Sequence, residues 1–241
     1  MNLFKRSRKH VSIVLLGLAS MMASSFAIAN ESTAMVGSIS DLQTVLSANN
    51  IVRGEFTQTR NMEMFAQPLT SQGTFLLDKS NGLLWTQATP FPVSLVLTDN
   101  KLSQRFADQP AKIITDKENP MAFYFSHIFL SVFHGDTQKL QEQFSLDFAP
   151  ATATSSDENA ENKSWILTLK PKSAPMNAVF EAITLQGQND IKRIELREIR
   201  GDSTVIEFSQ LSHLPEVLSD AEAQQFQLYS CPCLACFRHA I

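Results

Sequence analysis

The sequence predicts an α+β fold built on one large, mostly antiparallel β-sheet, and three observations lead to this prediction. Most of the chain alternates apolar with polar residues, which is typical of strands that have one buried face. Short turn sequences such as Asn189-Asp190 and Gly201-Asp202 separate the alternating segments. Residues 120–133 instead carry apolar side chains at helical spacing, so helices interrupt the sheet halfway along the chain.

The first 29 residues have the three parts of a cleavable secretory signal peptide. Residues 5–9 include four basic side chains, and residues 11–28 form an apolar stretch broken by serines. Ala27-Ile28-Ala29 places small side chains where signal peptidase reads them, so we expect export across the inner membrane and a mature start at Asn30. An uncleaved anchor is the alternative, which the polar residues after the cut disfavour. No cysteine follows the cut, so lipid anchoring is not indicated.

The charge of the mature chain argues against a nucleic-acid ligand. The expected signal peptide holds four of the 20 basic residues and none of the 24 acidic ones, so its removal lowers the formal charge from −4 to about −8. Phosphate-binding grooves need clustered Lys and Arg, and the longest such run in the mature chain is Lys192-Arg193. The remaining chain is long enough for one domain with its own core, and no second apolar segment approaches the length of a membrane span.

The first element of this domain is a short amphipathic helix. Ser40 and Gln43 form a capping box at its start, and Leu42, Val45 and Leu46 make its apolar face. Beyond this helix, alternation predicts five strands, at residues 52–59, 74–77, 83–86, 93–98 and 101–106.

A pair of helices then interrupts the strands. Pro120 can open the first helix, which is apolar almost all round, and Gly135 ends it. Asp136 or Thr137 can cap the second helix, which runs through Gln143. The apolar side of this second helix consists of Leu140 and Phe144. A helix as apolar as the first is covered on several sides or forms a lid over an apolar space.

The second half of the domain returns to strands after a polar, acidic loop at residues 149–163. The predicted strands are residues 165–170, 179–185, 193–199 and 204–208. One face of the second of these strands consists of Val179, Glu181, Ile183 and Leu185. A final amphipathic segment near residues 221–226 closes a single domain that we place at residues 30–228.

All three cysteines lie close to the C-terminus, at Cys231, Cys233 and Cys236. An odd number of cysteines in a terminal tail cannot link distant elements, so packing must hold the core together. With His239 they offer four zinc ligands, but their spacing differs from the usual paired ligand motifs. We therefore prefer to interpret residues 229–241 as a frayed tail without function.

No catalytic motif is recognisable. The chain lacks Gly-x-Ser-x-Gly, a Gly-rich phosphate loop and His-Glu-x-x-His, and its five histidines are scattered. His127 lies within the apolar helix, where a core or lid position is favoured over a general base. His134 and Asp136 flank Gly135, where helix capping is favoured over an acid-base pair. We expect no enzymatic activity, no cofactor and no metal.

Phenylalanine is unusually frequent, with 17 residues against two Tyr and two Trp. Because Phe offers apolar area without a polar group, a surface built from it suits a hydrocarbon ligand such as an acyl chain. The alternative is an ordinary core, in which Phe also occupies alternating strand positions. Taken alone, the composition favours the ordinary core.

Several short motifs follow one another in an order that is more specific than any one of them. In the first half these are Gly54-Glu55-Phe56-Thr57-Gln58-Thr59-Arg60, Pro68-Leu69, Ser71-x-Gly73-x-Phe75, and Gly82-Leu83-Leu84-Trp85 followed by Thr89-Pro90. In the second half they are Leu169-x-Pro171, the hairpin strands from Val179 to Ile199, and Arg200-Gly201-Asp202-Ser203-Thr204. In this order, from Ser38 to Phe226, the chain resembles the LolA family of outer-membrane lipoprotein carriers.

The resemblance implies an incomplete antiparallel β-barrel, with the N-terminal helix and the central helix pair as a lid over a hydrophobic cavity. In that family the cavity takes the acyl chains of a lipoprotein or other lipid from an inner-membrane exporter and passes them to an outer-membrane acceptor without covalent chemistry. We accordingly expect a periplasmic, monomeric carrier. The residues expected to line the cavity or the lid are Phe56, Phe75, Leu77, Trp85, Leu95, Leu97, Phe106, Phe123, Phe125, Ile128, Phe129, Val132 and Phe133.

The chain departs from the family where the lid is fastened. Family members carry a basic residue ahead of a proline between the Gly-x-Phe strand and the Trp, and here that stretch is Asp78-Lys79-Ser80-Asn81-Gly82. Lys79 is therefore the candidate lid latch, although it lacks the forked donor of arginine. This difference favours a divergent branch of the family and leaves the cargo open. A sensor or regulatory module on the same fold, and an enzyme, are the alternative functions.

Overall fold

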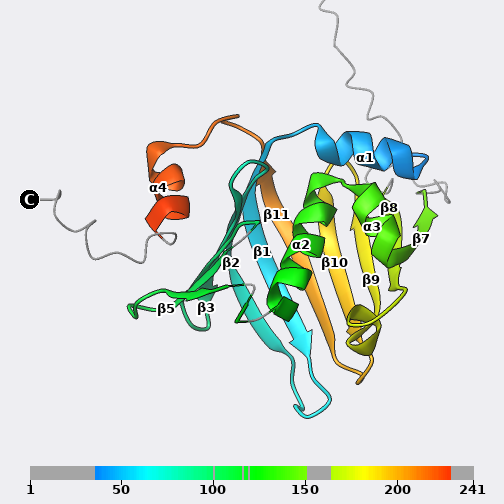
Figure 1. Ribbon diagram of the computed structural model, residues 1–241, viewed down its shortest axis with the longest axis horizontal. Coiled ribbons are helices and arrows are strands. Elements are labelled where there is room, and N and C mark those ends of the chain that lie inside the picture. The colour runs from blue at the N-terminus through cyan, green and yellow to red at the C-terminus, as the bar shows by residue number, and fades with distance from the viewer. Residues whose placement is uncertain (1–35, 100, 116, 119, 151–163, 229–241) are drawn as a thin grey trace, which may run out of the picture. The chain divides into compact units, whose positions relative to one another are not determined.

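The computed structural model describes residues 36–99, 101–115, 117–118, 120–150 and 164–228, and all of them belong to one compact unit (Figure 1). The expected signal peptide and the cysteine-containing tail lie outside the described residues. Of the helices that the structure describes, none is both long and apolar enough to cross a membrane.

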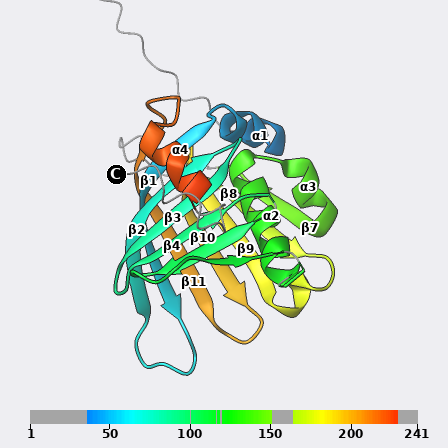
Figure 2. The same cartoon turned by 60° about the vertical axis from the view of Figure 1, so that its left-hand side comes forward.

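One curved antiparallel sheet of eleven strands forms the unit, which confirms the predicted α+β fold. The strand order is β6-β5-β4-β3-β2-β1-β11-β10-β9-β8-β7, so β1 and β11 join a first-half wing to a second-half wing. β6 and β7 are the two edges and do not pair with each other, which leaves the barrel incomplete (Figures 1 and 2). The strands are β1 Ile51–Asn61, β2 Leu69–Asp78, β3 Gly82–Thr89, β4 Val93–Leu97, β5 Leu102–Phe106, β6 Lys112–Ile114, β7 Phe144–Ala149, β8 Trp165–Pro171, β9 Phe180–Gly187, β10 Ile191–Glu198 and β11 Ser203–Ser212.

Helix α1 spans Ile39–Ser47, and its N-cap is Ser38 rather than the predicted Ser40. The Ser38 hydroxyl accepts a hydrogen bond from the Asp41 backbone N–H at 3.1 Å, and the Asp41 carboxylate accepts one from the Gly37 N–H at 3.2 Å. The predicted capping box is therefore wrong, because the helix begins before it. On the predicted apolar face, Leu42 is buried in the core, and Val45 and Leu46 are partly buried against it.

Helices α2 (Pro120–His134) and α3 (Thr137–Gln143) form the predicted pair. Gly135 separates them with a φ of 67°, a conformation that glycine adopts without strain. Asp136 caps α3, because its carboxylate accepts a hydrogen bond from a backbone N–H of the first turn. Phe144, predicted on the apolar side of α3, is instead the first residue of β7 and is fully buried.

A bulge in β9 changes the predicted alternation of this strand. Arg197 of β10 lies opposite Ala182, whereas the next residue lies opposite Phe180, so Glu181 is left without a partner in the ladder. Phe180 consequently shares a face with Ile183, while Glu181 is exposed. Val179, which the sequence places on that face, precedes the strand at the end of a 3-10 turn at Met176–Ala178.

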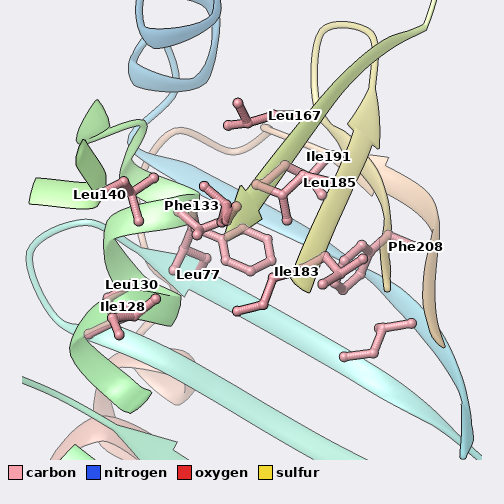
Figure 3. Close-up of a cluster of buried hydrophobic side chains, with 14 of the residues drawn as sticks. Leu77, Ile128, Leu130, Phe133, Leu140, Leu167, Ile183, Leu185, Ile191 and Phe208 are labelled. Carbon is pink, nitrogen blue, oxygen red and sulfur yellow. The ribbon is translucent and has the colours of Figure 1, made fainter. Parts of the chain in front are cut away.

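The main hydrophobic core lies on the concave face of the sheet, beneath α1, α2 and α3. Leu42 of α1, Phe133 of α2 and Leu140 of α3 belong to the same buried cluster as strand residues from both wings. Figure 3 shows part of this cluster, with Phe133 and Ile183 on the same side of the sheet.

Helix α4 (Asp220–Leu228) covers the other face of the sheet (Figure 2). Its Phe226 and the preceding Leu218 pack on a smaller apolar cluster that consists of Leu76, Leu84 and Val96. These three residues alternate with residues of the main core, so they point to the opposite side. The Arg53 guanidinium makes a two-pronged ion pair with Glu222 of α4, at 2.7 and 2.9 Å.

Candidate functional site

A cavity of about 380 Å³ lies between α2 and the concave face of the sheet. Its size falls within the range of about 300–1,000 Å³ that is usual for small-molecule sites. The lining residues are Gln58, Leu83, Trp85, Leu95, Leu97, Leu102, Ser126, Ile128, Phe129, Val132, Met176, Phe180, Ile183, Leu185, Ile194, Leu196 and Ile206. Strands from both wings contribute, so the cavity exists only because the sheet curves around it.

The lining is almost entirely apolar. Apart from Gln58 and Ser126, every lining side chain is aliphatic, aromatic or a thioether. Such a surface offers neither ionisable groups nor several hydrogen-bond donors, and it is suited to hold hydrocarbon by burial.

One face of α2 forms the roof of the cavity. Ser126, Phe129 and Val132 recur every three residues and therefore project to the same side of the helix. The Phe129 ring lies 4.8 Å from that of Phe133, which in turn lies 5.6 Å from Phe208 of β11. An aromatic contact thus ties this part of the lid to the floor.

The floor beside the lid is also aromatic. Phe56 of β1 stacks on Trp85 of β3 with ring centroids 3.7 Å apart, and Phe75 of β2 meets Phe208 edge-on at 5.0 Å. Trp85 lines the cavity, whereas Phe56 and Phe75 are buried behind it. This rigid packing fixes the inner end of the cavity.

The structure places the residues that the sequence singles out in several different environments. Six of them line the cavity: Trp85, Leu95, Leu97, Ile128, Phe129 and Val132. Four are buried in the adjoining core and do not line the cavity: Phe56, Phe75, Leu77 and Phe133. Phe123 is buried in α2 outside the lining, and the side chain of Phe125 is not among those described.

The prediction that Phe106 lines the cavity or the lid is wrong, because its side chain lies outside the lining. It is the last residue of β5, lies opposite Val93, and is 52% exposed. The alternation of β5 places Leu102 in the wall, but the strand ends where Phe106 would follow it.

The sequence-based site also lacks the second-half wall. Ile183, Leu185, Ile194, Leu196 and Ile206 of β9, β10 and β11 all face the cavity. Their alternating spacing marks a buried face, but spacing alone does not distinguish a cavity wall from a filled core.

Lys79 contacts α1, the N-terminal helix of the predicted lid. Its ammonium Nζ donates a hydrogen bond to the Ser47 carbonyl oxygen at 2.6 Å, at the C-terminal end of α1 where a cation is favoured. Burial lowers the pKa of Lys79 from its usual value. Within the predicted lid, this hydrogen bond reaches α1, and the latch role of Lys79 stays a prediction.

His134, the last residue of α2, shares a small polar pocket of about 190 Å³ with Lys79 and Asp99. Its Nε2 is buried and has no hydrogen-bond partner within the described part of the chain. Burial, reinforced by the Lys79 ammonium, lowers the pKa of His134.

The other histidines are separate from one another. His127 is exposed on α2, where its Nε2 lies 2.7 Å from the Asp99 carbonyl oxygen, so the lid position is right and a core position is not. His213 lies 3.2 Å from the Asp190 carboxylate. In the described ranges, three or more His, Cys, Asp or Glu side chains never gather as a metal site would require.

Comparison with protein families matches residues 47–222 to the family described as outer membrane lipoprotein carrier protein LolA. A search of curated proteins gives no match. The family match covers both wings of the sheet, α2 and α3, and therefore every element that lines the cavity.

Similar solved structures are distant. A DUF1329 family protein from Desulfovibrio piger is 12% identical with a TM-score of 0.43, and the match covers 76% of this chain and 93% of that one. A domain provisionally described as an outer membrane lipoprotein-sorting protein, from Vibrio parahaemolyticus, is 10% identical with a TM-score of 0.44 and coverages of 79% and 97%. A LolA superfamily protein from Nitrosomonas europaea is 8% identical with a TM-score of 0.38 and coverages of 78% and 96%.

Proposed function

The chain belongs to the LolA family of outer membrane lipoprotein carrier proteins, and from this premise we propose that it binds acyl chains of a lipoprotein or another lipid in the cavity beneath α2. The observation that carries the proposal is the lining itself. A roof of Ile128, Phe129 and Val132 faces a floor of aliphatic strand residues, with two polar side chains among them. Burial of hydrocarbon is therefore the main interaction that this lining offers a ligand.

The energetics suit a reversible carrier. Each methylene buried away from water contributes about 0.8 kcal/mol, so burial in the cavity can offset the hydrocarbon contacts that an acyl chain loses when it leaves a membrane. Release of the acyl chain requires that the free energy of its burial in the cavity be lost when the lid moves. The roof is one helix, and its Phe133 ring contacts Phe75 and Phe208 of the sheet at 6.4 and 5.6 Å. Because these contacts join side chains and not backbone, the lid can move without unfolding the sheet.

The same proposal includes the path of the lipid cargo between the two membranes. After export directed by residues 1–29, the protein receives its cargo from an inner-membrane exporter and delivers it to an outer-membrane acceptor. It works as a periplasmic monomer, without a cofactor and without a chemical reaction.

Displacement of a fluorescent acyl probe tests the proposal. The wild-type protein should bind the probe and release it to a competing fatty acid or lysolipid. Phe129→Asp should weaken binding at least about tenfold, because it places a carboxylate in an apolar wall. The matched control is Phe106→Asp, the same change at an exposed phenylalanine outside the lining. A wild-type cavity indifferent to acyl probes, or equal loss in both variants, would contradict the proposal.

A further inference from the structure

Gln58 is a polar residue in a row of apolar ones. It lies on β1 opposite Ile206 of β11, which lies opposite Ile194 of β10, which lies opposite Leu185 of β9. All four residues line the cavity. Replacing the single glutamine with an aliphatic residue would make this row across the floor continuous, so its amide requires a separate explanation.

The carboxamide of Gln58 is available for a ligand. Across the described residues, no side chain or backbone group makes a hydrogen bond to it. Its neighbour on the other side is Ser71 of β2, which is buried and directly opposite in the ladder. Gln58 is half-buried, and its amide carries both donors and an acceptor. A ligand that displaces water from this amide must replace the lost hydrogen bonds. A ligand carbonyl would satisfy the donor.

The polarity of β1 rises in one direction along the concave face. Phe56, Gln58 and Arg60 project to the same side, because the pairing of β1 with both neighbours is regular over these residues. Phe56 is 2% exposed and stacked on Trp85, whereas the Arg60 side chain is 43% exposed at the end of the strand. The series therefore runs from hydrocarbon to amide to guanidinium.

The charged end of this series has capacity for a polar group. Arg60 pairs with Glu198 at 3.3 Å and approaches Asp202 at 4.0 Å, a mixed-charge cluster at the end of the sheet. The Arg60 Nε is buried without a hydrogen-bond partner among the described residues, whereas the side chain as a whole is partly exposed, so a headgroup would meet the exposed part of the guanidinium. A lipid has the same order of polarity, from its tail through its ester or amide linkage to its headgroup.

We propose that Gln58 selects the chemical class of the ligand, by donating a hydrogen bond from its amide to the carbonyl oxygen of an ester or amide that links the acyl chain to its headgroup. The tail then lies toward Trp85 and the headgroup toward Arg60. This proposal rests on the proposed lipid-binding function and adds to it a preference for carbonyl-linked chains and a direction of entry.

Two ligands with the same chain length separate the linkage from the hydrocarbon. 1-Monomyristoylglycerol has an ester carbonyl, and 1-O-tetradecylglycerol has an ether in its place. Their dissociation constants are measured by displacement of a fluorescent acyl probe. The wild-type protein should prefer the ester about fivefold, the equivalent of one ordinary hydrogen bond.

Gln58→Leu should remove this preference, so that ester and ether bind about equally. Gln72→Leu makes the same chemical change at an exposed glutamine on the neighbouring strand, facing away from Ser71, and should keep the preference. If Gln58→Leu fails to fold, Gln58→Glu supplies the test, because a carboxylate cannot donate to the carbonyl and should weaken the ester more than the ether.

The failure of this inference is distinguishable from the failure of the proposed function. If the wild type binds ester and ether equally, or if Gln58→Leu keeps the ester preference, the selective role of Gln58 is overturned while lipid binding stands. If the wild type binds neither ligand, the carrier function and the inference are both overturned.

Discussion

At the scale of single residues, the two partly buried basic groups Lys79 and His134 have separate roles. Lys79 holds the C-terminal end of α1 through the Ser47 carbonyl, whereas His134 ends α2 with a buried, unpartnered Nε2. Because both lie in one small pocket, a proton gained by His134 would place two cations beside each other. Through these two side chains, the charge in this pocket acts on both α1 and α2.

Protonation of His134 should destabilise the folded protein. Burial lowers the folded pKa below the ordinary value of about 6.5, with Lys79 and Lys139 lowering it further and Asp99 and Asp136 opposing them. The unfolded chain thus binds the proton first, and the stability that neutral His134 provides is present above pH of about 6.5 and lost as the pH falls through the folded pKa. Urea unfolding at a series of pH values measures this slope. His134→Gln should reduce the slope, and an unchanged slope would contradict the assignment.

Lys79→Met should loosen α1 more than the other lid helices, α2 and α3. Loss of the charge-assisted bond to Ser47 should lower the free energy of unfolding by about 1 kcal/mol, given that the site is partly exposed. Hydrogen exchange should speed up in α1 more than in α2. Lys170→Met, at an exposed lysine of β8, is the control. Faster exchange confined to α2 would contradict the conclusion that Lys79 holds α1.

At the scale of secondary-structure elements, α4 is fastened to the convex face by one ion pair and one small apolar cluster. Arg53 also donates to the Pro215 and Val217 carbonyl oxygens at 2.8 and 3.1 Å, so a single side chain holds both the helix and the loop that leads to it. The hydrogen bond from Arg53 lowers the pKa of Glu222 to about 2. This contact stabilises the fold from the face opposite the cavity.

Removing the Glu222 carboxylate should destabilise the protein near neutral pH and not in acid. Glu222→Gln should cost about 1 kcal/mol at pH 7, an amount reduced by solvent screening. The folded pKa lies below the ordinary value of about 4.3, so the difference from wild type is full above that value and vanishes as the pH falls to about 2. Thermal unfolding of both proteins over this range measures the difference. A constant difference at every pH would contradict the ion-pair account.

Most elements follow from the sequence because their signals are local. The spacing of Pro120 and Gly135 fixes α2, and the turn at Gly201-Asp202 fixes the hairpin of β10 and β11. Two of the misses are non-local. Phe144 fits an α3 helix by spacing, yet it pairs with Pro171 across the sheet and becomes a strand residue. The bulge at Glu181 is set by the ladder with β10, which no spacing reveals.

At the scale of the whole sheet, the cavity depends on residues that are far apart in the chain. Leu83 and Leu97 come from the first-half wing, Ile183 and Ile206 from the second, and α2 is inserted between the wings in sequence. Sequence reasoning identifies the lid and the first-half wall, because those segments are strongly apolar. It does not predict which apolar residues are buried in the core and which line the cavity. Phe56 and Trp85 stack on each other, but only Trp85 faces the cavity.

The central claim is that the cavity holds an acyl chain, and mass spectrometry of lipid extracted from the protein purified from its native compartment tests it most directly. We predict an acyl lipid at up to one molecule per protein, lost in Phe129→Asp and retained in the exposed-site control Phe106→Asp. Extracts of the wild type and of Phe129→Asp that are equally poor in acyl lipid, at the level of a buffer blank, would contradict the account.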